Sequence, residues 1–271
     1  MTKCLNLCEI ISTKNINEKD VLCTLTNLIS QHQRVYVGSY FCSQYFLKCN
    51  IYKIIYDIAK EKGRGMTLVI PVFSEKDLEK GKKLLTELMD TYGDLIDEIT
   101  VNDIGMLAYV KKLFDKKINL GRLFFKDQRD ARVPDYYERT ITPNLLTYME
   151  YLDSISLVEL DRTNRRVELC NVKDVEVAMH IPFCYMTTGN ICKFASINKV
   201  VESKFRPNCS CNQECASVYE KTPVSNDEQI SELYRIGRTI YHYNNDIVEN
   251  DISRIIYFPF KEMVAAITEE D

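Results

Sequence analysis

The stretch MTLVIPVFSEKDLEKGKKLLTELMDTYGDLIDEITV (66–101) contains one complete strand–helix–strand unit. Residues 66–73 are almost continuously apolar and rich in β-branched side chains, which predicts a strand buried on both faces. Ser74 and Asp77 then have the spacing of a helix cap. The helix that follows carries its apolar residues on one face, at Leu78, Leu85 and Leu88. A second apolar strand at 96–101 closes the unit, which is the repeating element of a parallel sheet.

The same alternation runs through most of the chain. Strands are predicted at 5–12, 35–40, 66–73, 96–101, 118–125, 155–160, 175–182 and 254–258. Helices are predicted at 21–30 (after an Asn17-x-x-Asp20 cap), 51–58, 78–88, 104–114, 144–152 (after Thr142-Pro143) and 261–270. Eight strands in this order predict an α/β fold, a TIM-like (β/α)8 barrel that is either complete or open on one side. An open doubly wound sheet is the alternative, but the glycine-rich dinucleotide fingerprint of such sheets is missing.

The regular alternation stops after residue 160. The segment 184–224 is rich in cysteine and is predicted to be an insertion after the seventh strand. A Ser225-x-x-Glu228 cap is followed by apolar residues with helical spacing, which predicts a long helix through Ile230, Leu233, Tyr234 and Ile240. We therefore expect one barrel domain over residues 1–271 that carries a cysteine-rich, cluster-binding insertion at 184–224.

Composition limits the class of protein. The chain has 45% hydrophobic and 27% charged residues, as soluble folded proteins do, and a net charge of −4. This charge argues against a protein whose main function is to coat nucleic acid. No apolar run reaches the roughly 20 residues of a membrane span, and the N-terminus does not resemble a signal peptide. Eleven cysteines without a secretion signal predict a reducing, cytoplasmic location, where thiols bind metals, react as nucleophiles or fill the core.

The cysteines follow the ends of two predicted strands. Cys42 comes just after the second strand, and Cys192, Cys211 and Cys215 come after the seventh. In a parallel barrel both positions lie at the C-terminal mouth, so these thiols are expected to meet there. Four thiolates suit a 4Fe–4S cluster or a structural zinc ion. The spacing leaves cluster, zinc and no metal all open, although the paired Cys-x2-Cys motifs of zinc ribbons are absent.

Several motifs resemble one known family. VYVGSYFCSQ (35–44), EITVNDIGMLAYVKKL (98–113), INLGRLFFKDQRDAR (118–132) and the block CKFASINK…CSCNQEC (192–215) are together similar to the collagenase-like peptidases of the U32 family. The resemblance covers roughly residues 33–220. It implies a TIM-like barrel and a 4Fe–4S cluster whose ligands are Cys42, Cys192, Cys211 and Cys215. Cys209 or Cys184 could replace one of these ligands.

The remaining cysteines are predicted to be small buried hydrophobic residues, at Cys4, Cys8, Cys23, Cys49 and Cys170.

Polar residues at the other strand ends are candidates for substrate binding. Asn102 ends the fourth strand and Arg122 the fifth, and Arg129 lies in the basic stretch that follows. Arginine could bind a carboxylate-bearing substrate or an RNA phosphate, because its guanidinium matches such groups. The plainer alternatives are a helix N-cap at Asn102 or Asp103, before the helix that starts at Ile104, and a solvated basic loop. His180, at the end of the seventh strand, is expected to be a hydrogen-bonded structural residue rather than a base.

The resemblance also implies a function. Family relatives take part in oxygen-independent hydroxylation, so we expect a 4Fe–4S protein in such a hydroxylation or a related anaerobic redox modification of a small aromatic molecule. The chain would be the hydroxylase or its accessory subunit, paired as a heterodimer with a second U32-family protein. An RNA-modifying hydroxylase and a non-catalytic metal-stabilised module are alternatives. A peptidase ranks last, because the sequence has neither a readable Ser–His–Asp arrangement nor a His-Glu-x-x-His motif.

Overall fold

Eight parallel strands close into a barrel in the computed structural model, which describes residues 1–10, 18–125, 155–161, 175–207, 209, 211–215, 218–224, 232–244 and 252–268. The strand order around the barrel is β1-β12-β7-β6-β5-β4-β3-β2. The strands are β1 (Thr2–Asn6), β2 (Arg34–Gly38), β3 (Gly65–Ile70), β4 (Ile96–Val101), β5 (Lys117–Leu120), β6 (Ile155–Asp161), β7 (Glu176–Ile181) and β12 (Arg254–Tyr257). The pairing of β1 with β12 completes the circle, so the predicted TIM-like barrel is confirmed and is closed.

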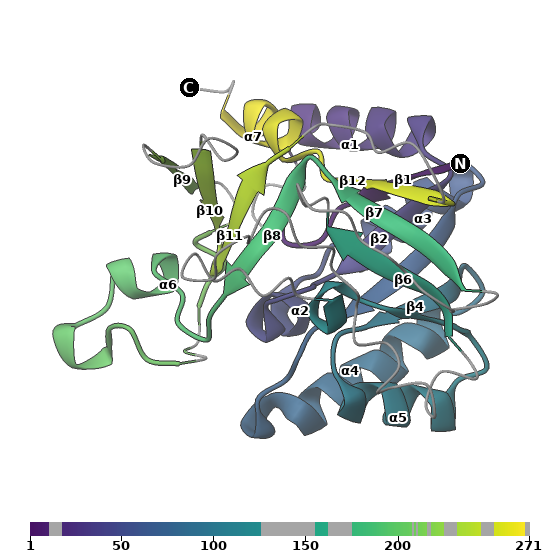
Figure 1. Cartoon of the computed structure of the whole chain (residues 1–271), viewed down its shortest axis with the longest axis horizontal. Coiled ribbons are helices and arrows are strands. Elements are labelled where there is room, and N and C mark those ends of the chain that lie inside the picture. The colour runs from purple at the N-terminus through teal and green to yellow at the C-terminus, as the bar shows by residue number, and fades with distance from the viewer. Residues whose placement is uncertain are drawn as a thin grey trace, which may run out of the picture.

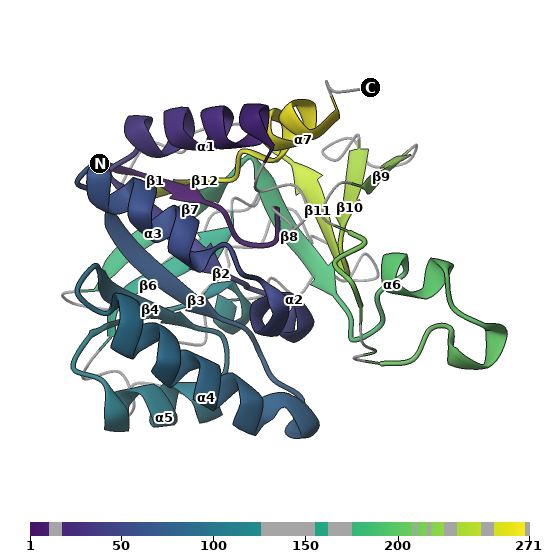
Figure 2. The ribbon, with the colours of Figure 1, turned by 180° about the vertical axis from the view of Figure 1, so that it is seen from behind.

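The described helices that pack on the barrel follow β1, β2, β3, β4 and β12 and lie on its outside (Figures 1 and 2). They are α1 (Lys19–Gln31), α2 (Ser43–Lys48), α3 (Tyr52–Glu61), α4 (Glu75–Tyr92), α5 (Ile104–Leu113) and α7 (Phe260–Thr268). Their apolar faces pack on the strands, as the buried Val21, Leu25 and Ile29 of α1 show. The predicted helix at 144–152, the Thr142-Pro143 cap and Asn17 lie outside the described residues. Among the described helices, none is both long and apolar enough to cross a bilayer.

The predicted strand–helix–strand unit at 66–101 forms, although β3 ends at Ile70 and not at residue 73. Ser74 is the N-cap residue of α4, and its hydroxyl donates to the Asp77 carboxylate at 2.8 Å. The Leu85 and Leu88 side chains of α4 are buried against the barrel. Strand β4 has the predicted bounds, whereas β5 ends at Leu120 and a short 3-10 helix, Arg122–Phe125, replaces the rest of the predicted strand 118–125.

Charged and polar side chains cross the barrel interior. Arg254 of β12 donates to the Glu98 carboxylate of β4 at 2.7 Å and to the Tyr36 hydroxyl of β2 at 2.8 Å. Strands β12 and β4 lie on opposite sides of the barrel, so this ion pair spans its width. Arg34 adds a second cation, 3.6 Å from Glu98. Buried charges are tolerated only when they are paired, and each of these groups has a partner.

A separate antiparallel sheet stands beside the barrel. Strands β8 (Phe183–Thr188), β9 (Tyr219–Pro223), β10 (Glu232–Ile236) and β11 (Thr239–Tyr243) pair in the order β8-β11-β10-β9. The predicted insertion at 184–224 supplies β9 and nearly all of β8, and the sheet then continues to Tyr243. Figure 1 shows this sheet next to the barrel and connected to it through β7 and β8.

The prediction of a long helix through Ile230, Leu233, Tyr234 and Ile240 is wrong. Residues 232–243 form the β10–β11 hairpin, with a two-residue turn at Gly237-Arg238. Gly237 has φ +58, a left-handed conformation that favours a tight turn and that a continuing helix cannot contain. Ile236 and Tyr234 are buried while Arg235 and Leu233 are half-exposed, which is the two-residue period of a strand. Ser225, Glu228 and Ile230 lie outside the described residues.

Candidate metal centre

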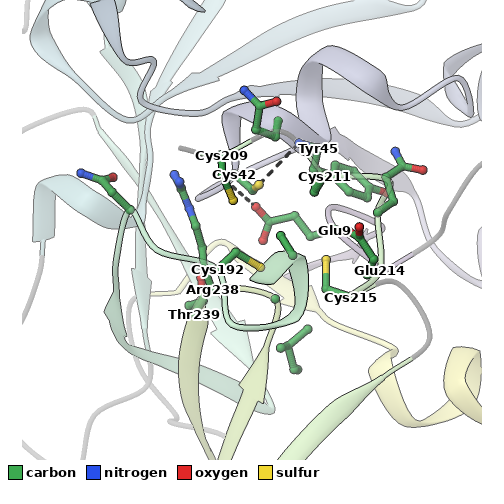
Figure 3. A pocket seen from close by; sticks show the side chains of 16 residues that line it. Glu9, Cys42, Tyr45, Cys192, Cys209, Cys211, Glu214, Cys215, Arg238 and Thr239 are labelled. Carbon is green, nitrogen blue, oxygen red and sulfur yellow. Dashed lines mark hydrogen bonds between the residues drawn. The ribbon is translucent and has the colours of Figure 1, made fainter. Parts of the chain in front are cut away.

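Five cysteines line one pocket at the C-terminal mouth of the barrel. They are Cys42, Cys192, Cys209, Cys211 and Cys215. The pocket lies where the loops after β1 and β2 meet the cysteine-rich segment and the β10–β11 turn, and it contains about 610 Å³ of empty space, part of it open to solvent. Figure 3 shows the side chains of Cys42, Cys192, Cys209 and Cys215 around it. The predicted gathering of distant thiols at the mouth is therefore observed.

Cys42 occupies the start of helix α2. It is the N-cap residue, and its sulfur accepts a hydrogen bond from the backbone N–H of Tyr45 at 3.4 Å. Burial raises the pKa of the Cys42 thiol to about 12, although the Arg238 guanidinium works in the opposite direction. Without a bound cation the thiol is therefore protonated, and a metal would have to displace its proton to bind the sulfur.

Glu9 places a carboxylate in the same pocket. Its Oε1 atom accepts the backbone N–H groups of Phe41 at 2.9 Å and Cys42 at 2.8 Å, and it also accepts the Ser39 hydroxyl. Glu9 itself has φ +65, which is unfavourable for a residue other than glycine. The turn after β1 thus holds a strained residue whose side chain fixes the loop that carries Cys42. Such strain is often found at functional sites.

Two cysteines of the pocket influence each other's pKa. Interaction between the Cys192 and Cys215 thiols lowers the pKa of Cys192 and raises that of Cys215. The chain reverses direction between Cys211 and Cys215 through Gln213, whose φ is +62. This turn allows two thiols that are separated by three residues to line the same pocket.

Two cations attach the cysteine-rich segment and its sheet to the barrel. The ammonium group of Lys48, in α2, donates to the carbonyl oxygen of Cys211 at 2.5 Å. The guanidinium of Arg238, in the β10–β11 turn, donates through Nε to the carbonyl oxygen of Phe41 at 2.7 Å. Arg238 also favours the thiolate forms of Cys42 and Cys192 by its charge. The pocket is therefore built jointly by the barrel and the added sheet.

The donor set fits a sulfur-ligated group. Its cysteines line a common, largely enclosed space with a cation beside them, which suits thiolate ligands. No three His, Cys, Asp or Glu side chains in the part of the chain that the structure describes are close enough to hold one metal ion. Around a single zinc ion four thiolates would stand within about 4 Å of one another, given Zn–S bonds of about 2.3 Å. In a polynuclear cluster each thiolate binds a different metal atom, so the thiolates need not approach one another so closely.

The structure distinguishes between Cys209 and Cys184, the two cysteines that could replace a predicted ligand. Cys209 lines the pocket, so it remains an alternative to Cys211. Cys184 lies in β8, fully buried and away from the pocket lining, where its thiol donates weakly to the Pro182 carbonyl at 3.9 Å. Of the thiols predicted to be core residues, three are buried, Cys23 is exposed on α1, and Cys170 lies outside the described residues.

Two of the predicted substrate-binding residues are engaged with protein groups. The Asn102 amide donates to the Ile70 carbonyl at 2.9 Å, at the ends of β4 and β3. Arg122 is buried, forms an ion pair with Asp161, and donates to the Phe183 carbonyl at 2.9 Å. The two contacts of Arg122 join β6 of the barrel to β8. Arg129 lies outside the described residues, and contact of all three with a substrate stays a prediction.

A buried acid–imidazole pair lies deeper in the barrel. Glu159 accepts hydrogen bonds from the Tyr40 hydroxyl at 2.7 Å and the Thr100 hydroxyl at 2.6 Å, and its Oε2 lies 3.0 Å from Nε2 of His180. Burial raises the pKa of Glu159 to about 7 and lowers that of His180. The pair holds one proton near neutrality, and His180 is hydrogen-bonded as expected. Tyr40 connects this pair to the loop that carries Cys42.

Glu9 and Arg238 are site residues that the sequence patterns do not predict. Glu9 falls inside the segment 5–12 that was predicted as a strand, whereas β1 ends at Asn6 and Glu9 lies in the turn after it. Arg238 was predicted to lie in a helix. The glycine before it, flanked by alternating apolar residues in RIGRTIYHY (235–243), is the signal for a hairpin that would have placed Arg238 in a turn.

No family model matches this chain, and no curated protein shows significant similarity to it. One solved structure, that of the U32 peptidase Mk0906, is similar with a TM-score of 0.47 over 95% of this chain and 92% of that one, at 12% sequence identity. At this level the similarity adds nothing to the assignment of the barrel, which rests on the strand pairing. The family resemblance of the sequence motifs stays a prediction.

Proposed function

We propose that the pocket binds a 4Fe–4S cluster through Cys42, Cys192, Cys211 and Cys215. The observation that carries the proposal is the lining of one pocket by thiols from well-separated parts of the chain, one from the barrel and the others from the cysteine-rich segment. Four thiolates with no histidine among the pocket-lining residues are a ligand set of such clusters.

With four cysteine ligands, each iron atom of the cluster has a protein ligand, so the cluster would transfer electrons rather than bind a substrate directly. Within the U32 family, the sequence motifs are most similar to the iron–sulfur protein UbiV of oxygen-independent ubiquinone hydroxylation. On this basis we place the chain in the anaerobic hydroxylation, or a related redox modification, of a small aromatic molecule. It would act there as the enzyme or as the electron-carrying subunit of a heterodimer with a second U32-family protein, in the cytoplasm.

A metal-stabilised structural module is the second candidate. The contacts of Lys48 with Cys211 and of Arg238 with Phe41 join the barrel to the added sheet at this pocket. A metal at this junction could serve only to hold the two parts together. The RNA-modifying alternative gains nothing from the described part of the basic stretch, because Arg122 is buried against Asp161.

The proposal is tested by anaerobic purification and reconstitution of the wild type and of Cys42→Ala, with iron, sulfide and zinc measured together with the visible spectrum. We expect about four irons and four sulfides per wild-type chain, absorbance near about 400 nm, and loss of both in Cys42→Ala. Cys23→Ala is the matched control, because Cys23 is exposed on α1 and should leave the cluster unchanged. Zinc in the wild type would support the structural module, and no metal after reconstitution would contradict both candidates.

A further inference from the structure

An arm of the cysteine-rich segment projects away from the rest of the molecule. It covers residues 193–207 and contains helix α6 (Phe194–Ile197) and the 3-10 helix Val201–Ser203. Both views show it extending outward from the barrel and the four-stranded sheet (Figures 1 and 2). It begins directly after Cys192, at the edge of the cysteine pocket.

The base of the arm is ordered by internal contacts. Phe194 and Ala195 are buried, and the Ser196 hydroxyl donates to the Cys192 carbonyl at 2.9 Å. The same hydroxyl accepts the backbone N–H of Phe205 at 3.0 Å, which closes the arm into a loop. The part of the arm beyond this closure is therefore a defined structure rather than a tail.

The outer part of the arm exposes apolar side chains. The exposed fractions are 57% for Ile197, 67% for Val200, 79% for Val201 and 56% for Phe205. Phe205 also has φ +54, which is rare for a bulky residue. Exposure of four large apolar groups on one projection is unfavourable in water unless another surface covers them.

The same arm is basic in an acidic protein. It carries Lys193, Lys199, Lys204 and Arg206 against the single acid Glu202, whereas the whole chain has a net charge of −4. Lys193, at the base of the arm, forms an ion pair with Glu220 of β9. The Arg206 guanidinium donates only to the backbone carbonyl of Glu202 among its described partners, a contact that leaves its charge uncompensated. Lys204 and Arg206 therefore place positive charge on both sides of the exposed Phe205 in the sequence.

We propose that this arm docks on the surface of an anionic lipid bilayer. Aliphatic and phenyl groups would enter the interface between head groups and acyl chains, and the cations around them would bind the lipid phosphates. A bilayer accepts a convex apolar projection, whereas a protein partner would need a matching cavity. Protein interfaces are also depleted in lysine and rich in tyrosine and tryptophan, and the exposed apolar residues of the arm are aliphatic apart from one phenylalanine.

Docking at this point would place the cysteine pocket close to the membrane surface. The inference does not depend on the proposed cluster, because the arm's exposed groups and charges belong to the polypeptide. It also requires no membrane-spanning segment.

The test is co-sedimentation of the full chain with vesicles of phosphatidylcholine alone and of an equal mixture of phosphatidylcholine and phosphatidylglycerol. We expect binding to the anionic vesicles, weak binding to the neutral ones, and release by high salt. Lys204→Gln combined with Arg206→Gln should weaken binding by about 25-fold, at roughly fivefold for each cation. Val200→Ser combined with Val201→Ser should weaken it by roughly tenfold or more.

Leu113→Ser is the matched control, because Leu113 is 50% exposed on α5 and lies outside the arm. It should bind vesicles as the wild type does, and thermal unfolding should confirm that every variant folds. The proposal is overturned if the wild type does not bind anionic vesicles or if the arm variants bind as well as it does.

Discussion

The backbone N–H of Cys42 donates to the Glu9 carboxylate at 2.8 Å, across 33 residues of sequence. The Phe41 backbone N–H and the Ser39 hydroxyl donate to the same oxygen. One carboxylate thus accepts hydrogen bonds from three residues of the turn that precedes helix α2. The position of the Cys42 sulfur is thus set by a residue from the neighbouring strand–helix connection. Glu9 also contributes a negative charge to the cysteine pocket.

Replacement of Glu9 should separate these two effects. Glu9→Ala removes the acceptor of several hydrogen bonds, so we expect loss of bound iron and a decrease of about 2 kcal/mol or more in the free energy of unfolding. Glu9→Gln retains an acceptor oxygen but not the charge, so iron should stay bound while the reduction potential of the cluster rises. Iron quantitation, urea unfolding and a redox titration measure the three quantities.

Glu214→Gln is the control for charge, because Glu214 lines the same pocket and accepts only the Asn212 backbone N–H among described contacts. It should leave both iron content and stability close to those of the wild type. Equal behaviour of Glu9→Ala and Glu214→Gln would show that Glu9 does not position Cys42.

The two thiols at 209 and 211 should differ in their contribution to the cluster. Lys48 holds the carbonyl of Cys211 in place, which fixes its backbone against α2. We therefore expect Cys211→Ser to lose iron and sulfide and Cys209→Ser to retain them. Iron-to-protein ratios after identical anaerobic reconstitution decide the matter, and the reverse result would assign the ligand to Cys209.

Single replacements in the buried pair of Glu159 and His180 should produce opposite pH dependences. Burial raises the folded-state pKa of Glu159 to about 7, so the stability that it contributes is complete below its unfolded value and is lost as pH rises through about 7. His180 has a lowered pKa, so its contribution is lost as pH falls below its unfolded value of about 6.5. In the wild type the two effects largely cancel, because the folded and the unfolded pair each hold one proton near pH 6.

Accordingly, His180→Gln should lose stability from pH 5 to pH 7, and Glu159→Gln should lose it from pH 7 to pH 5, each by at most about 1.4 kcal/mol per pH unit. Urea unfolding at several pH values measures both slopes. Parallel slopes in the two variants would contradict the shared proton.

Gly38, at the end of β2, should tolerate no side chain. A Cβ atom there would lie 2.2 Å from the Val69 carbonyl oxygen, and the φ angle of Gly38 is +115. Gly38→Ala should lower the free energy of unfolding by at least about 3 kcal/mol, because steric overlap adds to backbone strain. Gly63→Ala is the control that adds backbone strain without steric overlap, because Gly63 has φ +61 and nothing lies within 4 Å of the new Cβ atom. It should lower the free energy of unfolding by about 1 kcal/mol. Similar losses in the two variants would mean that the backbone at Gly38 moves freely.

The barrel could be predicted because its information is local. Each strand is a short apolar run, and each helix carries an apolar stripe, so the alternation itself specifies a parallel sheet. The meeting of Cys42 with the later cysteines followed from the same rule, since strand ends of a parallel barrel share one face. The spacing of apolar residues misled where Leu233, Tyr234 and Ile240 happen to suit a helix, although Gly237 reverses the chain between them. It also made the strands predicted at 5–12 and 118–125 too long at their C-terminal ends.

Other features depend on contacts that sequence patterns do not encode. The roles of Glu9 and Arg238 arise from hydrogen bonds to a loop more than 30 residues away in one case and 197 residues away in the other. The shared proton of Glu159 and His180 likewise requires strands β6 and β7 to be side by side. Such pairings are set by tertiary structure, so neither residue type nor spacing identifies them in advance.

The bond between Arg238 and Phe41 also constrains how the protein is made. One wall of the pocket is synthesised early and the other only after most of the chain has left the ribosome. A nascent chain that ends before residue 238 lacks the turn that completes this wall of the pocket. For the cluster proposed above, iron delivery would then follow translation of nearly the whole polypeptide, and unfinished chains would not hold the cofactor in this pocket.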